Sequence, residues 1–150
     1  VIMYRATQDG IGEILGTVTI ANSPLKAIFK LALHGLLSGP HGFLVHENAN
    51  CDPTFLNSVR IPTGAAGGPF DPDTACKHEG PTGEGYLGDL PVVVSEANGT
   101  ATETLTAPRI KDINKLKGHS LIIHIGGDNY SDTPSLMGGS GGRLGCGLVE

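Results

Sequence analysis

Six side chains are candidates for a metal site, as possible ligands or as charges beside one: His46, His78, Asp89, His124, Asp128 and Arg143. Mixtures of imidazole and carboxylate suit zinc and copper, which accept both kinds of donor. Their spacing is a weak signal, because no H-x-H, C-x-x-C or H-E-x-x-H motif occurs. The residue types alone leave two interpretations open, a metal site or ordinary solvated loop histidines.

The elements that must position these side chains read as short strands. Segments rich in β-branched residues or in alternating residues cover 1–7, 14–21, 25–33, 41–47, 91–96, 100–107, 118–125 and 143–150. Turn signals such as Asp9-Gly10, Gly39-Pro40 and Asn98-Gly99 separate several of them. The one helical candidate is a single polar turn at 112–116. Eight short strands without convincing helices predict an all-β, closed antiparallel barrel or sandwich.

Two long loops follow strands that carry a histidine. The first loop, 48–90, follows His46, and the second loop, 126–142, follows His124. Loops of this length inside a compact domain are uncommon and are usually functional or disordered. We therefore expect both loops to close over a site that the two strands present.

Length and charge exclude several classes of protein. The 150 residues fit one domain spanning 1–150, and no apolar run is long enough for a membrane helix. The net charge of −5, with scattered basic residues, argues against nucleic acid as a partner. No signal peptide is visible, so an exported protein would be represented here in its mature form. Three cysteines, Cys51, Cys76 and Cys146, leave their pairing open.

Six motifs resemble the bacterial periplasmic branch of the copper/zinc superoxide dismutase family. They read HGFLVHENANC, GGPFDP, KHEGPTGEGYLGDLP, NGTATETLTAPRI, IIHIGGDNYSD and GGRLGCGLVE, and they run in order along the chain. The resemblance implies an eight-stranded Greek-key antiparallel β-barrel with two long loops. It also implies a periplasmic or secreted location and a disulfide between Cys51 and Cys146.

The same resemblance assigns copper ligands. The family holds copper with four histidines, one of which is shared with zinc. His46 and His124 match two of these positions, but Leu44 stands at the first and Pro69 at the shared one. Neither a leucine nor a proline side chain can coordinate a metal. Residual copper binding by His46 and His124 is the interpretation that survives, beside the simpler one of leftover buried histidines.

The zinc positions are also altered. His78 and Asp89 match zinc ligands, whereas Tyr86 stands where the family has a further histidine. A tyrosine could bind only as a phenolate, and its reference pKa is about 10. His78 and Asp89 could equally be hydrogen-bonded loop anchors. Asp128 matches the aspartate that links ligands of the two metals, and Arg143 matches the arginine that guides superoxide, here expected to be vestigial.

Three of the family's ligand positions, those of Leu44, Pro69 and Tyr86, are therefore lost in this comparison. We expect a superoxide dismutase-like exported protein that is not an enzyme and has no tightly bound cofactor, with weak copper or zinc binding as the alternative. Because the family relies on zinc to order the first loop, we expect 69–88 to be mobile or differently folded.

Two alternatives stay open. One is a copper-handling protein that uses His46 and His124, with a copper ion or another copper-handling protein as its partner. The other is an atypical superoxide dismutase. Cys76 is read as a free thiol, as a copper(I) ligand beside His78, or as half of an intermolecular disulfide. A homodimer is a further expectation. His34, His41 and His119 match no ligand position and are read as ordinary surface or strand histidines.

Overall fold

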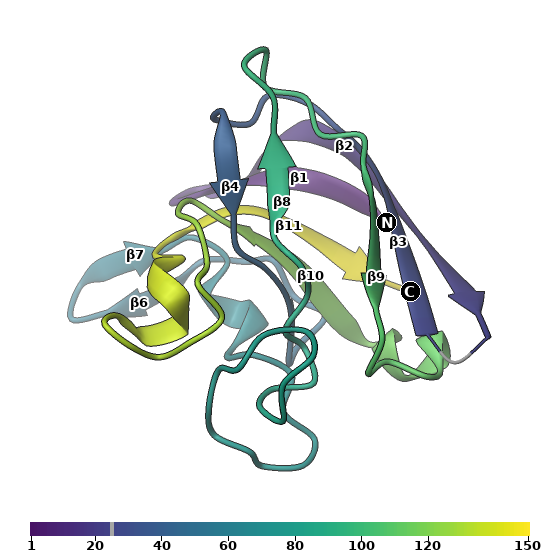
Figure 1. The fold of residues 1–150 in the computed structure, drawn as a ribbon. Helices are drawn as coiled ribbons and strands as arrows, with labels where there is room; N and C mark the ends of the chain where they lie inside the picture. Colours follow the sequence, from purple (N-terminus) through teal and green to yellow (C-terminus); the bar gives the residue numbers. More distant parts are fainter. Residues whose placement is uncertain (25) are drawn as a thin grey trace.

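The computed structural model describes residues 1–24 and 26–150, and within them the fold is all-β (Figure 1). Its elements are β1 (Ile2–Thr7), β2 (Gly10–Ser23), β3 (Lys26–Leu33), β4 (Gly39–His41), β5 (Phe43–His46), β6 (Thr54–Leu56), β7 (Val59–Ile61), η1 (Gly64–Ala66), β8 (Val93–Ser95), β9 (Thr104–Ala107), η2 (Ile113–Leu116), β10 (His119–His124), η3 (Leu136–Gly139) and β11 (Arg143–Val149). No helix among the described residues is long and apolar enough to cross a membrane.

The strands form one large curled sheet and two small pairs. Seven strands follow the order β5-β10-β11-β1-β2-β3-β9, and every neighbouring pair is antiparallel (Figure 1). β4 pairs with β8, and β6 pairs with β7. Each of the eight predicted strands has a counterpart, and the described residues add β4, β6 and β7. The first residue of the predicted 25–33 strand, Leu25, lies outside the described residues.

Alternating burial explains why the central strands form. In β3, four apolar residues at alternate positions point into the core, from Ala27 to Leu33, while Lys30 between them is exposed. Such period-two patterns are typical of a strand with one solvated face. β5 differs, because all four of its residues are buried. It must therefore be covered on its outer face as well as on its core face.

The first loop pairs with the free edge of β5. The Val45 N–H donates to the Gly88 carbonyl, and the Val45 carbonyl accepts from the Phe70 N–H, both at 2.8 Å. The Leu90 N–H donates to the Phe43 carbonyl at 3.1 Å. Two stretches of the loop thus lie along β5 as irregular strand partners. This satisfies the backbone groups that an edge strand would otherwise leave unpaired.

The first loop also contains a hairpin that the sequence pattern did not predict. β6 and β7 are joined through Asn57 and Ser58, and both residues have positive φ angles, 50° and 67°. Positive φ at both central positions is typical of the tight turns that suit hairpins. The prediction of a long loop without strands is therefore wrong in this stretch. The predicted turn at 112–116 is present as η2, with Asp112 accepting the Asn114 N–H.

A disulfide fastens the first loop to the large sheet. Cys51 is bonded to Cys146 of β11, and the two Cα atoms are 5.9 Å apart. These cysteines pack with Ala66 and Ile122 in a small buried cluster separate from the main core. The predicted pairing is confirmed. Cys76 is free and exposed.

Candidate metal centre

The ends of β5 and β10 bring two histidine rings face to face. Leu44 is paired with Ile122 in the middle of the two strands, and His46 and His124 lie on either side of that pair. Their Nε2 atoms are 3.4 Å apart and their ring centroids 5.5 Å apart. Both side chains are buried. The structure thus joins the two histidines that the resemblance assigned to copper.

Backbone carbonyls determine which ring nitrogen of each histidine carries the proton. His46 Nδ1 is 2.9 Å from the Gly67 carbonyl oxygen, and His124 Nδ1 is 3.0 Å from that of Gly141. Because a carbonyl only accepts, each Nδ1 must be the donor, which leaves each Nε2 with a free lone pair. Two neutral lone-pair donors therefore face one another, and neither can donate a hydrogen bond to the other.

Burial keeps both rings neutral. Burial, followed by the charge of Arg143, lowers the pKa of His46 to about 3. Burial also lowers the pKa of His124, against the opposing effect of its hydrogen bond to Gly141. Near neutral pH the pair consequently carries no proton on either Nε2. Unprotonated imidazole is the form that binds metal ions.

Arg143 is held beside this pair by the first loop. Its Nη1 donates to the Thr63 carbonyl at 2.7 Å, and its Nη2 donates to the Gly67 carbonyl at 2.6 Å. The Gly67 oxygen therefore accepts from both Arg143 and His46. The loop fixes a cation close to the two histidines. The sequence pattern contained no sign that Thr63 and Gly67 would do this.

Apolar residues occupy the neighbouring positions. Leu44 is fully buried in the middle of β5, and Pro69 forms an isolated bridge with His46. The adjoining Gly68 carbonyl accepts the Glu47 N–H at 2.9 Å. Pro69 lacks an N–H, so the bridge forms through its neighbours. Neither side chain offers a donor atom to a metal ion.

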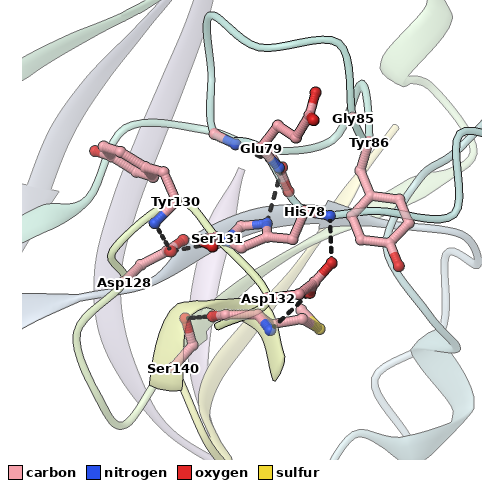
Figure 2. Close-up of polar contacts among 12 residues, drawn as sticks. His78, Glu79, Gly85, Tyr86, Asp128, Tyr130, Ser131, Asp132 and Ser140 are labelled. Atoms are coloured by element: carbon pink, nitrogen blue, oxygen red, sulfur yellow. Dashed lines mark hydrogen bonds and ion pairs between the residues drawn. The ribbon is translucent and has the colours of Figure 1, made fainter. Parts of the chain in front are cut away.

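A second buried group, which we call the His78 cluster, consists of His78, Asp89 and Asp128. His78 Nε2 is 2.6 Å from Asp128 Oδ1 (Figure 2). His78 Nδ1 is 2.8 Å from Asp89 Oδ2, a charge contact without the alignment of a hydrogen bond. All three side chains are at most 1% exposed. The structure therefore joins the two predicted zinc residues with the predicted linking aspartate.

The two carboxylates make this histidine a cation. Burial alone would lower the pKa of His78, but its hydrogen bond to Asp128 and the negative charges of Asp89 and Asp128 outweigh this effect and raise the pKa to about 9. Near neutral pH, His78 is thus an imidazolium between two carboxylates. This is the opposite electrostatic state from that of His46.

Tyr86 lies near His78 but is a poor metal donor. The ring centroids of the two residues are 6.4 Å apart. Burial, followed by the charges of Asp132 and Asp71, raises the pKa of Tyr86 above its usual value of about 10. The side chain is therefore a neutral phenol under ordinary conditions. Its backbone is tied down separately, because Arg109 donates to the Tyr86 carbonyl at 3.3 Å.

Residues that sequence reasoning missed hold the His78 cluster in place. Asp132 Oδ2 accepts the His78 N–H at 2.9 Å (Figure 2). The Tyr130 hydroxyl accepts the Val92 N–H at 3.0 Å, and the Tyr130 N–H donates to Asp128 at 2.7 Å. Tyr130 and Asp132 lie in the IIHIGGDNYSD motif, which was the available signal for them.

Two histidines read as ordinary also contact the site. His41 is buried, with Nδ1 2.8 Å from the His124 carbonyl oxygen and Nε2 2.7 Å from that of Leu37. His119 Nδ1 lies 3.2 Å from the His46 carbonyl oxygen. His34 is exposed. His41 and His119 therefore support the backbone of the histidine pair rather than forming part of a separate surface.

The donors fit the two metals of the family to different extents. His46 and His124 fit a copper ion held by two imidazoles, because their buried lone pairs converge and have no other partner. They do not form the family's four-histidine set. His78 and Asp89 supply two donors where structural zinc takes four. Within the part of the chain that the structure describes, no group of three or more His, Cys, Asp or Glu side chains has the arrangement of a metal site.

Comparison with known proteins places these observations in a family. The family model described as copper/zinc superoxide dismutase matches residues 14–149. A Cu-Zn superoxide dismutase of Salmonella typhimurium is 48% identical over 149 residues, covering 99% of this chain and 84% of the relative. The Cu-Zn superoxide dismutase of Brucella abortus is 44% identical over 148 residues, covering 99% of this chain and 86% of the relative.

Solved structures agree. The Cu/Zn superoxide dismutase from Brucella abortus matches with a TM-score of 0.98, covering 100% of this chain and 97% of the other. The monomeric copper, zinc superoxide dismutase from Salmonella enterica matches with a TM-score of 0.90 at 44% identity, covering 100% and 97% of the two chains. The Brucella match means that the first loop follows a path like that of its relative. Of the two alternatives expected for 69–88, a different fold is therefore wrong, and mobility stays a prediction.

These relatives also overturn two expectations about chemistry. We expected a protein that is not an enzyme and has no tightly bound cofactor. Relatives at 44% and 48% identity over nearly the whole chain are named Cu-Zn superoxide dismutases, which points to a metal-dependent enzyme. Counting the replaced positions gave too little weight to the paired imidazoles of His46 and His124, whose lone pairs still converge. On the whole of this comparison, the chain belongs to the copper/zinc superoxide dismutase family.

Proposed function

We propose that this protein is an atypical superoxide dismutase whose copper ion is held by His46 and His124. The observation that carries the proposal is the pair of unpartnered Nε2 lone pairs, 3.4 Å apart in a buried site. Superoxide as the substrate comes from the names of the relatives. Imidazole nitrogen is a suitable copper ligand, and two such donors match the low coordination that copper(I) accepts.

The chain's own residues supply binding, orientation and charge. Copper, when bound, would supply one-electron chemistry. The carbonyls of Gly67 and Gly141 hold both Nδ1 protons, so that both Nε2 atoms stay free for coordination. Arg143 places a positive charge beside the pair, which favours the approach of an anion such as superoxide.

We infer that the histidine pair is what is left of a larger donor set. Leu44, Pro69 and Tyr86 stand where the family resemblance places three further ligands. In support of this, Leu44 is buried without any donor atom, and burial disfavours the phenolate form of Tyr86. The proposed enzyme therefore works with fewer protein ligands than the motif of its family implies.

The test combines metal analysis, copper titration and a dismutase assay. Protein purified without added metal, then loaded with copper and freed of excess, should hold about one copper ion and disproportionate superoxide faster than aqueous copper. His46→Ala and His124→Ala should each weaken copper binding by about 100-fold or more and abolish the excess rate. His34→Ala, at an exposed histidine, is the matched control. Equal copper affinity in all four proteins would sink the proposal.

A copper-handling role is the second candidate, and the same experiment separates it. The buried, neutral pair supports copper binding without by itself supporting turnover. If His46→Ala and His124→Ala lose copper but the loaded wild-type protein is no faster than aqueous copper, storage or delivery of copper becomes the better description. A protein that exchanges copper with this chain would then be its partner.

We further propose that residues 1–150 act as one exported domain in an oxidising compartment, periplasmic or extracellular. The Cys51–Cys146 disulfide supports this location, since such bonds persist outside the reducing cytosol. A homodimer stays a proposal as well, and one of the solved relatives is described as monomeric. Sedimentation of the metal-loaded protein distinguishes the two states.

A further inference from the structure

The His78 cluster connects three parts of the molecule. Asp89 is bridged to Leu44 of β5, so it is anchored on the large sheet. His78 contacts Asp89 on one side and Asp128 on the other, at 2.8 and 2.6 Å. Asp128 belongs to the second loop, which follows β10. The cluster therefore spans from the edge of β5, through the first loop, to the second loop.

Backbone hydrogen bonds reinforce the same connection. Asp89 Oδ2 accepts the N–H groups of Glu79 and Gly80 at 3.2 and 3.1 Å. From the second loop, Asp132 accepts the His78 N–H at 2.9 Å and the Met137 N–H at 3.2 Å (Figure 2). Each carboxylate thus carries main-chain donors as well as its own charge. These bonds hold the turn at 78–80 from both sides.

The contacts of the His78 cluster are buried and charged, and they join segments that are distant in the sequence. The three side chains are almost completely buried, and each of the two carboxylates faces the same imidazole. Removing Asp128 would leave the buried Nε2 donor of His78 without its acceptor, which is more costly than losing an exposed ion pair.

We propose that the His78 cluster is a latch that keeps the first loop docked on the second loop without requiring a metal ion. Order in the first loop would then survive removal of bound metal. The proposal is independent of copper binding by His46 and His124, because none of the latch contacts involves either residue. It concerns what orders the loop, and it holds whichever metals the loaded protein carries.

Limited trypsin digestion tests the latch, because Lys77 is exposed and adjoins His78. Cleavage after Lys77 is followed by mass spectrometry in metal-loaded protein and in protein treated with EDTA and dialysed. Wild-type protein should be cleaved at rates that differ by less than about 3-fold between the two states. Asp128→Asn should raise the rate by about 10-fold or more in both states. Asp73→Asn, an exposed carboxylate of the same loop, is the control and should match wild type.

Either of two results would overturn the proposal. A rise of about 10-fold or more in wild-type cleavage after EDTA treatment would mean that metal, and not the latch, orders the loop. Cleavage of EDTA-treated Asp128→Asn at the wild-type rate would mean that the cluster has no such role. Should Asp128→Asn fail to fold by circular dichroism, Asp132→Asn weakens the backbone bonds that Asp132 accepts from His78 and Met137 and is expected to raise the rate by a smaller factor. The wild-type comparison needs no variant at all.

Discussion

The two histidine sites of this molecule are close in the fold and opposite in chemistry. At one, His46 and His124 are neutral and direct two lone pairs at each other. At the other, His78 is an imidazolium enclosed by Asp89 and Asp128. The lone pairs of His46 and His124 are free to bind a cation. In the His78 cluster, the proton on the imidazole already supplies the positive charge between the two carboxylates.

The difference teaches how a protein can satisfy a buried histidine. Carbonyl oxygens around a buried ring hold one proton and leave a donor free, as Gly67 does for His46. Carboxylates on both sides hold two protons and leave none free, as for His78. The surroundings, rather than the histidine itself, therefore decide whether a site stays open to metal. The first loop is also fastened in two ways, by the Cys51–Cys146 disulfide and by the ion pairs of the His78 cluster.

The largest expected effect comes from removing the disulfide bond. Replacing Cys51→Ser together with Cys146→Ser should lower the free energy of unfolding by about 3–5 kcal/mol, because the bond closes a sequence separation of 95 residues. Urea denaturation at neutral pH measures it. Cys76→Ser is the control, and it should change stability by less than about 0.5 kcal/mol because Cys76 is free and exposed. A double variant as stable as this control would contradict the prediction.

An intermediate effect is expected from adding metal-binding side chains beside the His78 cluster. Pro69→His with Tyr86→His places imidazoles at the two positions where the family resemblance puts further zinc ligands, so that with His78 and Asp89 four donors become available to zinc. Zinc affinity, measured by competition with a chelating dye, should rise by at least about 10-fold. Pro72→His, at an exposed proline of the same loop, is the control. If zinc affinity does not change, His78 and Asp89 are held too firmly by their present contacts to turn toward a metal.

The smallest expected effect is a pair of opposite pH dependences in metal-free protein. The pKa of His78 is raised to about 9, so its contribution to stability is present below about pH 6.5 and is lost as pH rises toward 9. The pKa of His46 is lowered to about 3, so unfolded chains take up the extra proton first and stability falls as pH drops below about 6.5. Each term should amount to about 1–2 kcal/mol within about 1.5 pH units of pH 6.5.

Variants assign these two slopes. Urea midpoints are compared across pH. His78→Gln should reduce the loss of stability between about pH 6.5 and 9, and His46→Gln should reduce the loss of stability below about pH 6.5. A variant that leaves its own slope intact would contradict the assignment of that histidine. Loss of both slopes in one variant would mean that the two sites are coupled.

Local sequence patterns predicted the strands well and the loops poorly. All eight predicted strands are present because alternating residues such as Phe29 and Leu31 report burial directly. β4 was missed because Gly39 and Pro40 signalled a turn, although proline is tolerated in a short edge strand. The β6–β7 hairpin was missed because Asn57 and Ser58 reach positive φ without a glycine.

The sequence identified the residues of the site but not their protonation states. His46, His124, His78, Asp89 and Asp128 were all named, and the structure gathers them into two groups. Which of them would be cations could not be foreseen, because that depends on carbonyls and carboxylates that only the folded loops deliver. The counting of missing ligands also misled, because it ignored how the remaining donors face one another.

One carbonyl oxygen described above has a mechanical consequence. Gly67 accepts both the His46 ring proton and one arm of Arg143, so a single peptide plane steers a ring and a guanidinium together. Gly67 has a φ of 76°, a backbone conformation that residues with a side chain seldom adopt. Tilting that peptide plane would therefore move both the His46 ring, a proposed metal ligand, and the Arg143 guanidinium, which is proposed to attract the anion. A local backbone change at Gly67 would therefore reorient the His46 ring and the Arg143 guanidinium together.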